Sequence, residues 1–187
     1  MLSEKMTEAL NDQANRELYS SYLYLSMSAF FESLKFEGMA SWMRVQAAEE
    51  LVHAIKMYDY MVSAGGRAKM LAVEAPQFSW ASPLVVFQNV WNHERVVTGL
   101  INNLANLAIQ ENDEVTKSFL QWYLKEQVEE EESSDNVLNS VKTAGNDHEA
   151  LKEVDKALGL RRFSFPKGYD IFPYVSRQGI TIGSLKK

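Results

Sequence analysis

Four long amphipathic stretches each carry one glutamate in the middle of an apolar stripe. The apolar residues recur every three or four positions, the period of an α-helix that turns one side toward a core. The acidic residues are Glu17, Glu50, Glu94 and Glu130, and His53 completes a Glu-x-x-His step after Glu50. Charged groups are seldom buried unless they are paired or bound to a cation. Because these stripes contain no lysine or arginine, the pattern indicates a metal site.

Composition excludes several other kinds of protein. The chain has 187 residues, enough for one domain with a sizeable core, and a net charge of −6, which disfavours nucleic acid as a partner. It has no cysteine, so thiolate metal sites and thiol nucleophiles are ruled out. Its apolar runs are too short for a membrane span, and the start MLSEKM does not resemble a signal peptide. We therefore expect a cytoplasmic protein without a membrane partner.

The charge divides the chain into a body and a tail. Residues 1–159 hold 13 basic and 24 acidic side chains, whereas residues 160–187 hold six basic and one acidic. The second segment is also rich in aromatic residues and contains two of the four prolines. We interpret 1–159 as one helical di-metal domain and 160–187 as an appended tail.

The body is predicted to be an all-α bundle. The expected long helices cover residues 4–33, 37–64, 83–111 and 114–143, and a short fifth helix ends at Gly159. The first and last pairs are joined by a few residues, which predicts two antiparallel hairpins. The middle connection of about 18 residues can span roughly 55 Å, more than the roughly 42 Å of a 28-residue helix. This length favours a long crossover, although simple up-down-up-down order stays open.

The four acids are expected to meet inside this bundle. Counted from each hairpin turn, the paired glutamates lie within about one helical turn of each other. Four carboxylates and an imidazole suit iron or manganese, and the negative charge suits two divalent ions with Glu50 as the bridge. The alternative is that the acids are protonated or half exposed, and that His53 is an ordinary core histidine.

These motifs resemble the prokaryotic non-haem ferritins of the ferritin-like superfamily. The similarity covers about residues 3–158 and includes LYSSYLY, AAEELVH and FLQWYLKEQVEEE. It implies a four-helix bundle with a long crossover between the second and third helices. It also implies a homo-oligomeric shell of 24 subunits that oxidises Fe(II) with dioxygen and stores the ferric mineral. Haem is not expected, because Leu51 stands where the haem-binding relatives have a methionine.

The resemblance assigns three iron positions to residues of this chain. It implies a first iron held by Glu17, Glu50 and His53. A second would be held by Glu50, Glu94 and Glu130, with Gln127 close by. A third, transient iron would be held by Glu49, Glu126 and Glu129.

Tyr24 lies seven residues after Glu17 on the same helix face. The resemblance implies that Tyr24 supplies an electron to dioxygen. The alternative is a core tyrosine that only hydrogen-bonds a carboxylate.

The fourth helix departs from a symmetric di-iron pattern, in which Glu-x-x-His occurs twice. Here the second copy reads Gln127-x-x-Glu130 and so has one carboxylate and one imidazole fewer. Our hypothesis is that the second ion binds more loosely and leaves after oxidation, as storage requires.

The tail ends in ITIGSLKK, residues 180–187, with alternating apolar side chains and two lysines. This segment resembles the C-terminal peptides that load cargo into encapsulin shells, so residues Gly179–Lys187 could place the protein in such a compartment. The alternative is a tail that packs on its own shell or remains disordered.

Two other functions remain open from the sequence. One is a small di-iron peroxidase of the rubrerythrin kind, although the cysteines of its rubredoxin-like centre are absent. The other is a purely structural bundle with salt-bridged acids, which the lack of basic residues in the stripes disfavours.

Overall fold

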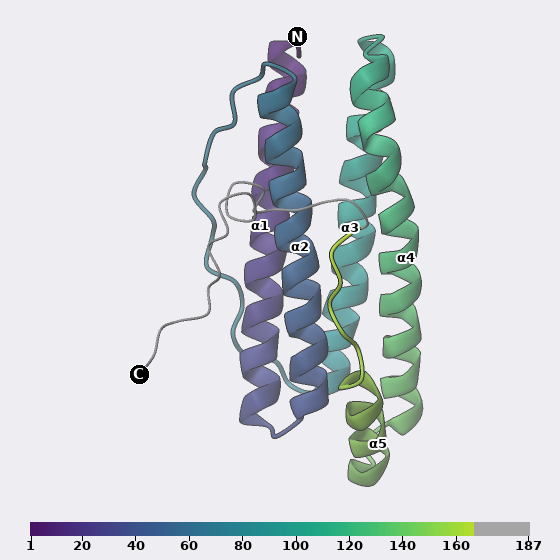
Figure 1. Cartoon of the computed structure of the whole chain (residues 1–187). Coiled ribbons are helices and arrows are strands. Elements are labelled where there is room, and N and C mark those ends of the chain that lie inside the picture. Colours follow the sequence, from purple (N-terminus) through teal and green to yellow (C-terminus); the bar gives the residue numbers. More distant parts are fainter. Residues whose placement is uncertain (167–187) are drawn as a thin grey trace, which may run out of the picture.

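The computed structural model describes residues 1–166, which form four long helices and one short one (Figure 1). The helices are α1 (Glu4–Ser33), α2 (Glu37–Ser63), α3 (Pro83–Gln110), α4 (Glu114–Ala144) and α5 (His148–Leu158). Their bounds agree with the predicted ranges to within about one residue. None of the helices in this part of the chain is long and apolar enough to cross a membrane. The segment proposed as a cargo peptide, Gly179–Lys187, lies outside the described residues.

Side-chain caps explain where several of these helices begin. The hydroxyl of Ser3 accepts a hydrogen bond from the Met6 amide at 2.9 Å, as its position before α1 predicts. Ser82 caps α3 in the same way, and Pro83 supplies the first-turn proline. Asp113 caps α4 by accepting from Thr116 N.

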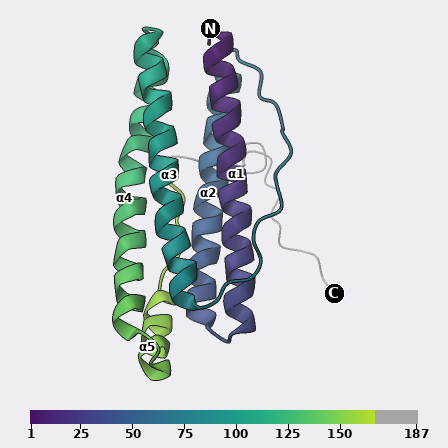
Figure 2. The ribbon, with the colours of Figure 1, turned by 180° about the vertical axis from the view of Figure 1, so that it is seen from behind.

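The connection between α2 and α3 runs the full length of the bundle. In Figure 1 the chain leaves the end of α2 beside the N-terminus and descends along the outside of the α1–α2 pair to the start of α3. Figure 2 shows the same path from behind. Helix α3 is therefore parallel to α2, and the predicted long crossover is confirmed.

The core consists of two apolar clusters with the acidic residues between them. Going along α1, Ala14 belongs to one cluster and Leu23 to the other, and Glu17 lies between them. In α3, Val90 and Val97 flank Glu94 in the same manner. The bundle therefore has a polar layer at mid-height, closed by hydrophobic packing on both sides.

Helix α5 is fixed to the start of α2 by a backbone contact. Asp155 of α5 accepts a hydrogen bond from the Met39 amide at 2.7 Å, which caps a helix that has no side-chain cap of its own. Gly38 permits this approach, because a Cβ atom there would lie 1.7 Å from the Asp155 carbonyl oxygen. Gly38 is thus the residue that allows α5 to dock.

We expect Gly38→Ala to destabilise the protein by roughly 2–3 kcal/mol and to release α5, because the added methyl group meets backbone that cannot move alone. Thermal unfolding and hydrogen exchange of α5 amides measure this effect. Gly99→Ala in α3 is the matched control, since a Cβ there meets nothing within 4 Å. That variant should be neutral or slightly stabilising. Equal stability of the two variants would contradict the docking role of Gly38.

After α5 the chain continues back along the bundle. Residues 160–166 rise from the end of α5 and lie over the groove between α2 and α4 (Figure 1). We call residues 160–166 the strap. Its first cation, Arg161, contacts α2 at the height of the acidic layer.

Candidate metal centre

Glu17, Glu50 and His53 form a buried cluster at the centre of the bundle. Each offers one ligand atom, and these atoms lie within 4.8 Å of one another. The His53 Nδ1 atom is 3.6 Å from Glu50 Oε2, because the i,i+3 spacing on α2 places both side chains on the same face. The exposed fractions of Glu17 and Glu50 are 1% each. The sequence-based expectation that these groups converge is therefore met.

Two carboxylate oxygens in this cluster lack a hydrogen-bond donor. The Oε1 atom of Glu17 accepts from Gln13 Nε2 at 2.9 Å, but its Oε2 atom has no hydrogen-bond partner among the described residues. The same holds for Glu50 Oε2. A buried carboxylate oxygen without a partner is costly. A cation bound between these side chains would neutralise the two oxygens that lack hydrogen-bond partners.

Burial and mutual repulsion raise the pKa of two acids in this layer, Glu50 and Glu94. Burial raises the pKa of Glu50 well above its usual range, and the neighbouring Glu94, Glu17 and Glu130 raise it further. The pKa of Glu94 rises to about 8, first through burial and then through Glu130. The protein alone therefore does not stabilise this much negative charge, and a pair of divalent cations would.

Glu94 enters the same layer from α3 and is fully buried. The Tyr24 hydroxyl donates a short hydrogen bond to Glu94 Oε1. Burial, followed by repulsion from Glu94 and Glu50, raises the pKa of Tyr24 far above its ordinary value. Gln127 Nε2 donates to the Glu94 carbonyl oxygen at 3.3 Å and to Thr98 Oγ1 at 3.2 Å. Tyr24 and Gln127 thus both contact Glu94.

Glu130 completes the layer from α4 and has one amide partner. The Nε2 atom of Gln46, a buried residue of α2, donates to Glu130 Oε2 at 2.8 Å. The hydroxyl of Tyr123 donates to the His53 carbonyl oxygen at 2.7 Å, which joins α4 to α2 beside the cluster. These contacts fix the relative height of the two helices that carry most of the candidate ligands.

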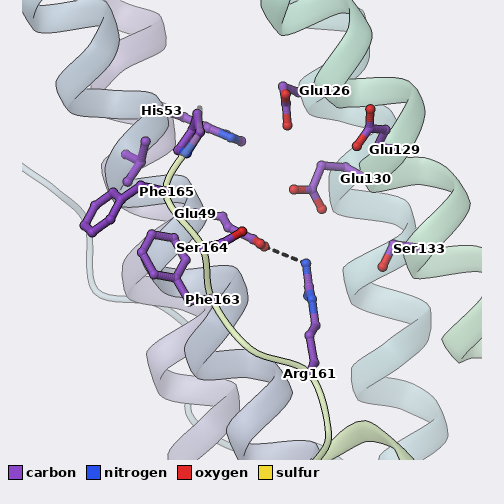
Figure 3. A pocket seen from close by; sticks show the side chains of 12 residues that line it. Glu49, His53, Glu126, Glu129, Glu130, Ser133, Arg161, Phe163, Ser164 and Phe165 are labelled. Atoms are coloured by element: carbon purple, nitrogen blue, oxygen red, sulfur yellow. Dashed lines mark hydrogen bonds and ion pairs between the residues drawn. The ribbon is translucent and has the colours of Figure 1, made fainter. Parts of the chain in front are cut away.

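A second group of acids lines a cavity between α2 and α4, next to the inner cluster. The cavity has a volume of about 560 Å³, and Figure 3 shows Glu49 on one side and Glu126, Glu129 and Glu130 on the other. His53 also lines it, so the cavity adjoins the buried site. The structure thus brings the three residues expected for the transient iron into one acidic pocket.

Burial also perturbs the acids of this outer pocket. It raises the pKa of Glu49 to about 7, against the lowering effect of the Arg161 guanidinium beside it. The pKa of Glu126 is raised by burial and then by repulsion from Glu129, and is lowered by His53. The outer pocket is therefore a second place where a cation would relieve charge repulsion.

The sequence analysis missed Gln13, Gln46 and Arg161. The two glutamines lie in the helix stripes and orient Glu17 and Glu130, but a single glutamine gives no recognisable sequence signal. Arg161 belongs to the segment interpreted as a tail, yet it forms an ion pair with Glu49 at 2.6 Å. Its role depends on the return of the chain along the bundle after α4, which no local pattern predicts.

The donor set suits hard and intermediate divalent cations. Carboxylate oxygens with one imidazole favour iron and manganese, and the absence of thiols disfavours a structural zinc or copper site. Glu17, Glu50 and His53 would hold one ion. Glu50, Glu94 and Glu130 would hold a second. The unpartnered oxygens of Glu17 and Glu50 fit that arrangement.

The family model and the relatives that this chain resembles all point to the same family. Residues 7–144 match the family model for a ferritin-like domain. The chain is 41% identical over 161 residues to a bacterial non-heme ferritin of Bacteroides fragilis, with 86% of this chain and 100% of the relative covered. It is 39% identical to that of Staphylococcus aureus, with 87% and 98% covered.

Among solved structures, an open-pore ferritin from the archaeon Archaeoglobus fulgidus is 50% identical, with a TM-score of 0.86. The match covers 87% of this chain and 100% of that one.

Proposed function

Since the chain belongs to the ferritin family of iron-storage proteins, we propose that it oxidises Fe(II) with dioxygen at a dinuclear centre and stores the product. The ligands proposed for the two ions are Glu17, Glu50, His53, Glu94 and Glu130. The observation that carries the proposal is the pair of buried carboxylate oxygens without hydrogen-bond partners, one on Glu17 and one on Glu50, the proposed shared ligand. A salt-bridged structural bundle would leave no such oxygens.

The residues of the centre have distinct roles in the oxidation. Two Fe(II) ions each give up one electron, and dioxygen accepts both and takes two protons to reach the level of peroxide. Closely spaced carboxylates stabilise Fe(III) more than Fe(II), because the interaction grows with cation charge. His53 provides the one neutral ligand, and the bond of Tyr123 to its backbone supports its position. Tyr24, hydrogen-bonded to Glu94, would supply the second electron and one proton when only one Fe(II) ion is bound, and would itself be oxidised to a neutral tyrosyl radical.

We infer that the second ion is the more loosely held. The Nε2 atom of Gln127 donates to Thr98 Oγ1 at 3.2 Å and to the Glu94 carbonyl oxygen at 3.3 Å. The only atom that Gln127 can offer a cation is its neutral amide oxygen, which attracts a cation less than a carboxylate does. Oxidised iron would leave through the outer pocket of Glu49, Glu126 and Glu129, which adjoins the centre. Two equally tight, non-exchanging sites in an iron titration would contradict this inference.

Aerobic addition of Fe(II), with size-exclusion chromatography before and after, tests the storage function. We expect a large homo-oligomeric shell, in keeping with the 24-subunit assembly of the family, that co-elutes with a brown ferric mineral. The variant Glu132→Gln, changed at an exposed position of α4, should behave like the wild-type protein in this experiment. A small oligomer that leaves iron to oxidise at the buffer rate would overturn the proposal.

The remaining expectations stay predictions. A cytoplasmic location, the absence of haem, and encapsulation through residues Gly179–Lys187 each need a direct test. The rubrerythrin-like peroxidase alternative gains no support from the relatives named above, which are ferritins.

A further inference from the structure

We propose that Arg161 of the strap is a positioning residue that acts on two of the iron positions in opposite directions. It occupies the outer acidic pocket as an internal counter-ion, which weakens iron binding there. Through Gln46 it also holds Glu130 in place for the second ion of the dinuclear centre. This inference rests on the proposed function and adds a control that the strap exerts over it.

Three contacts anchor the Arg161 guanidinium in the pocket. Its Nη2 atom lies 2.6 Å from Glu49 Oε2, and its Nη1 atom donates a short hydrogen bond to Gln46 Oε1. Its Cζ atom lies 4.9 Å from the centre of the buried Trp42 ring, a cation–π distance. The ion pair between Arg161 and Glu49 is partly screened from solvent, because only 25% of the Arg161 side chain and 23% of the Glu49 side chain are exposed. A guanidinium held at three points is a specific occupant and not a passing surface contact.

The rest of the strap forms one wall of the same pocket. Phe163 and Phe165 form an edge-to-face pair with centroids 4.8 Å apart, and both line the cavity (Figure 3). Arg161 is the only lysine or arginine among the lining residues in the described part of the chain. Because Glu49 is a proposed ligand of the transient iron, Fe(II) and Arg161 compete for the same carboxylate. Iron binding in the pocket must therefore displace the guanidinium, which lowers the apparent affinity.

A second effect reaches the dinuclear centre through the amide of Gln46. Its oxygen accepts from Arg161, and its nitrogen donates to Glu130 Oε2 at 2.8 Å. An amide has one acceptor end and one donor end, so the arginine fixes which end faces Glu130. Without Arg161, Gln46 is free to turn and Glu130 loses its fixed orientation. The second ion would then bind a less preorganised ligand.

Arg161 is thus proposed to weaken iron binding in the outer pocket and to strengthen binding of the second ion. A general effect of its charge would change both affinities in the same direction. Removing a positive charge near two cation sites should strengthen both through Coulomb's law. The contacts of Arg161 instead predict a stronger outer pocket and a weaker second ion. A variant that merely loosened the strap would strengthen the pocket without weakening the second ion.

Anaerobic Fe(II) titration of the assembled full-length protein by calorimetry tests the inference. For Arg161→Gln we expect the outer pocket to bind iron about tenfold more tightly, equivalent to about 1.4 kcal/mol. We expect the second ion to bind about threefold more weakly. Arg161→Lys keeps the positive charge. Iron should therefore bind in the outer pocket of this variant almost as weakly as in the wild-type protein. Arg162→Gln is the matched control, because within residues 1–166 the Arg162 side chain donates hydrogen bonds to the backbone of Gly159 and Arg161 and to no acid of the pocket.

A double variant tests the path through the amide. In a Gln46→Met background, Arg161→Gln should no longer weaken the second ion, because the connecting amide is gone. Persistence of that weakening would overturn the role of Gln46. Unchanged outer-pocket affinity in Arg161→Gln would overturn the counter-ion role. If the wild-type protein binds fewer than two ions per subunit, the proposed dinuclear function itself fails, and this inference fails with it.

Discussion

Replacing Glu50 with glutamine is expected to slow Fe(II) oxidation by roughly 100-fold or more, while stabilising the metal-free protein. The loss of activity follows from the position of Glu50 between both proposed ion positions, where removing its charge weakens each of them. The gain in stability follows from the unpartnered Glu50 Oε2, buried among acids that raise its pKa. An amide of the same shape needs no proton, and its N–H group can donate to Glu17.

Stopped-flow absorbance and calorimetry with a chelator present measure the two effects of Glu50→Gln. We expect the midpoint of thermal unfolding to rise by several degrees, the shift that about 1–2 kcal/mol gives a protein of this size. Glu132→Gln, at an exposed position of α4, should change neither quantity. Oxidation at the wild-type rate would exclude Glu50 as a shared ligand. A lower unfolding midpoint would show that the metal-free site is not under electrostatic strain.

The fold could be predicted closely because its determinants are local. The serines before α1 and α3 accept hydrogen bonds from the first turn, and the apolar period continues on both sides of the central glutamate of each helix. The length of the connection between α2 and α3 indicated the crossover, because an ordinary loop would not use so many residues. The mid-helix position of Glu17 and Glu50 then predicted a common height, which needs only the rise per residue of an α-helix.

The parts that could not be predicted depend on contacts between segments far apart in the sequence. Gly38 is unremarkable in the sequence, and its role appears only when Asp155 lies against it. Arg161 was assigned to a tail by composition, although it is the ion-pair partner of Glu49, 112 residues earlier. The expectation that no basic residue accompanies the acids holds for the helix stripes. It does not hold for the outer pocket, because the strap brings a cation there.

We also expect metal-free protein to lose stability as the pH rises from 6.5 to 8. The pKa of Glu94 is raised from 4.5 to about 8, so the folded protein retains a proton that the unfolded chain releases. Its contribution to stability is complete below pH 4.5 and is lost as the pH rises through about 8. Glu49, with a pKa of about 7, acts in the same direction over a narrower range. His93 acts oppositely, but burial lowers its pKa to about 4, so its effect ends near pH 6.5.

Between pH 6.5 and 8 the change in stability with pH therefore reports on the carboxylates and not on His93. Bound metal should reverse the direction of this change. Glu94 alone accounts for a loss of about 2 kcal/mol per subunit over this range in the presence of a chelator. With Zn²⁺, a cation that undergoes no redox chemistry, binding displaces the protons, so stabilisation grows as the pH rises. Calorimetry at one protein concentration should give unfolding midpoints that fall with pH without metal and rise with it. In Glu94→Gln the metal-free slope should be much smaller. A chelated wild-type protein that gains stability between pH 6.5 and 8 would mean that these acids are ionised without a cation, and the case for the metal centre would lose its electrostatic basis.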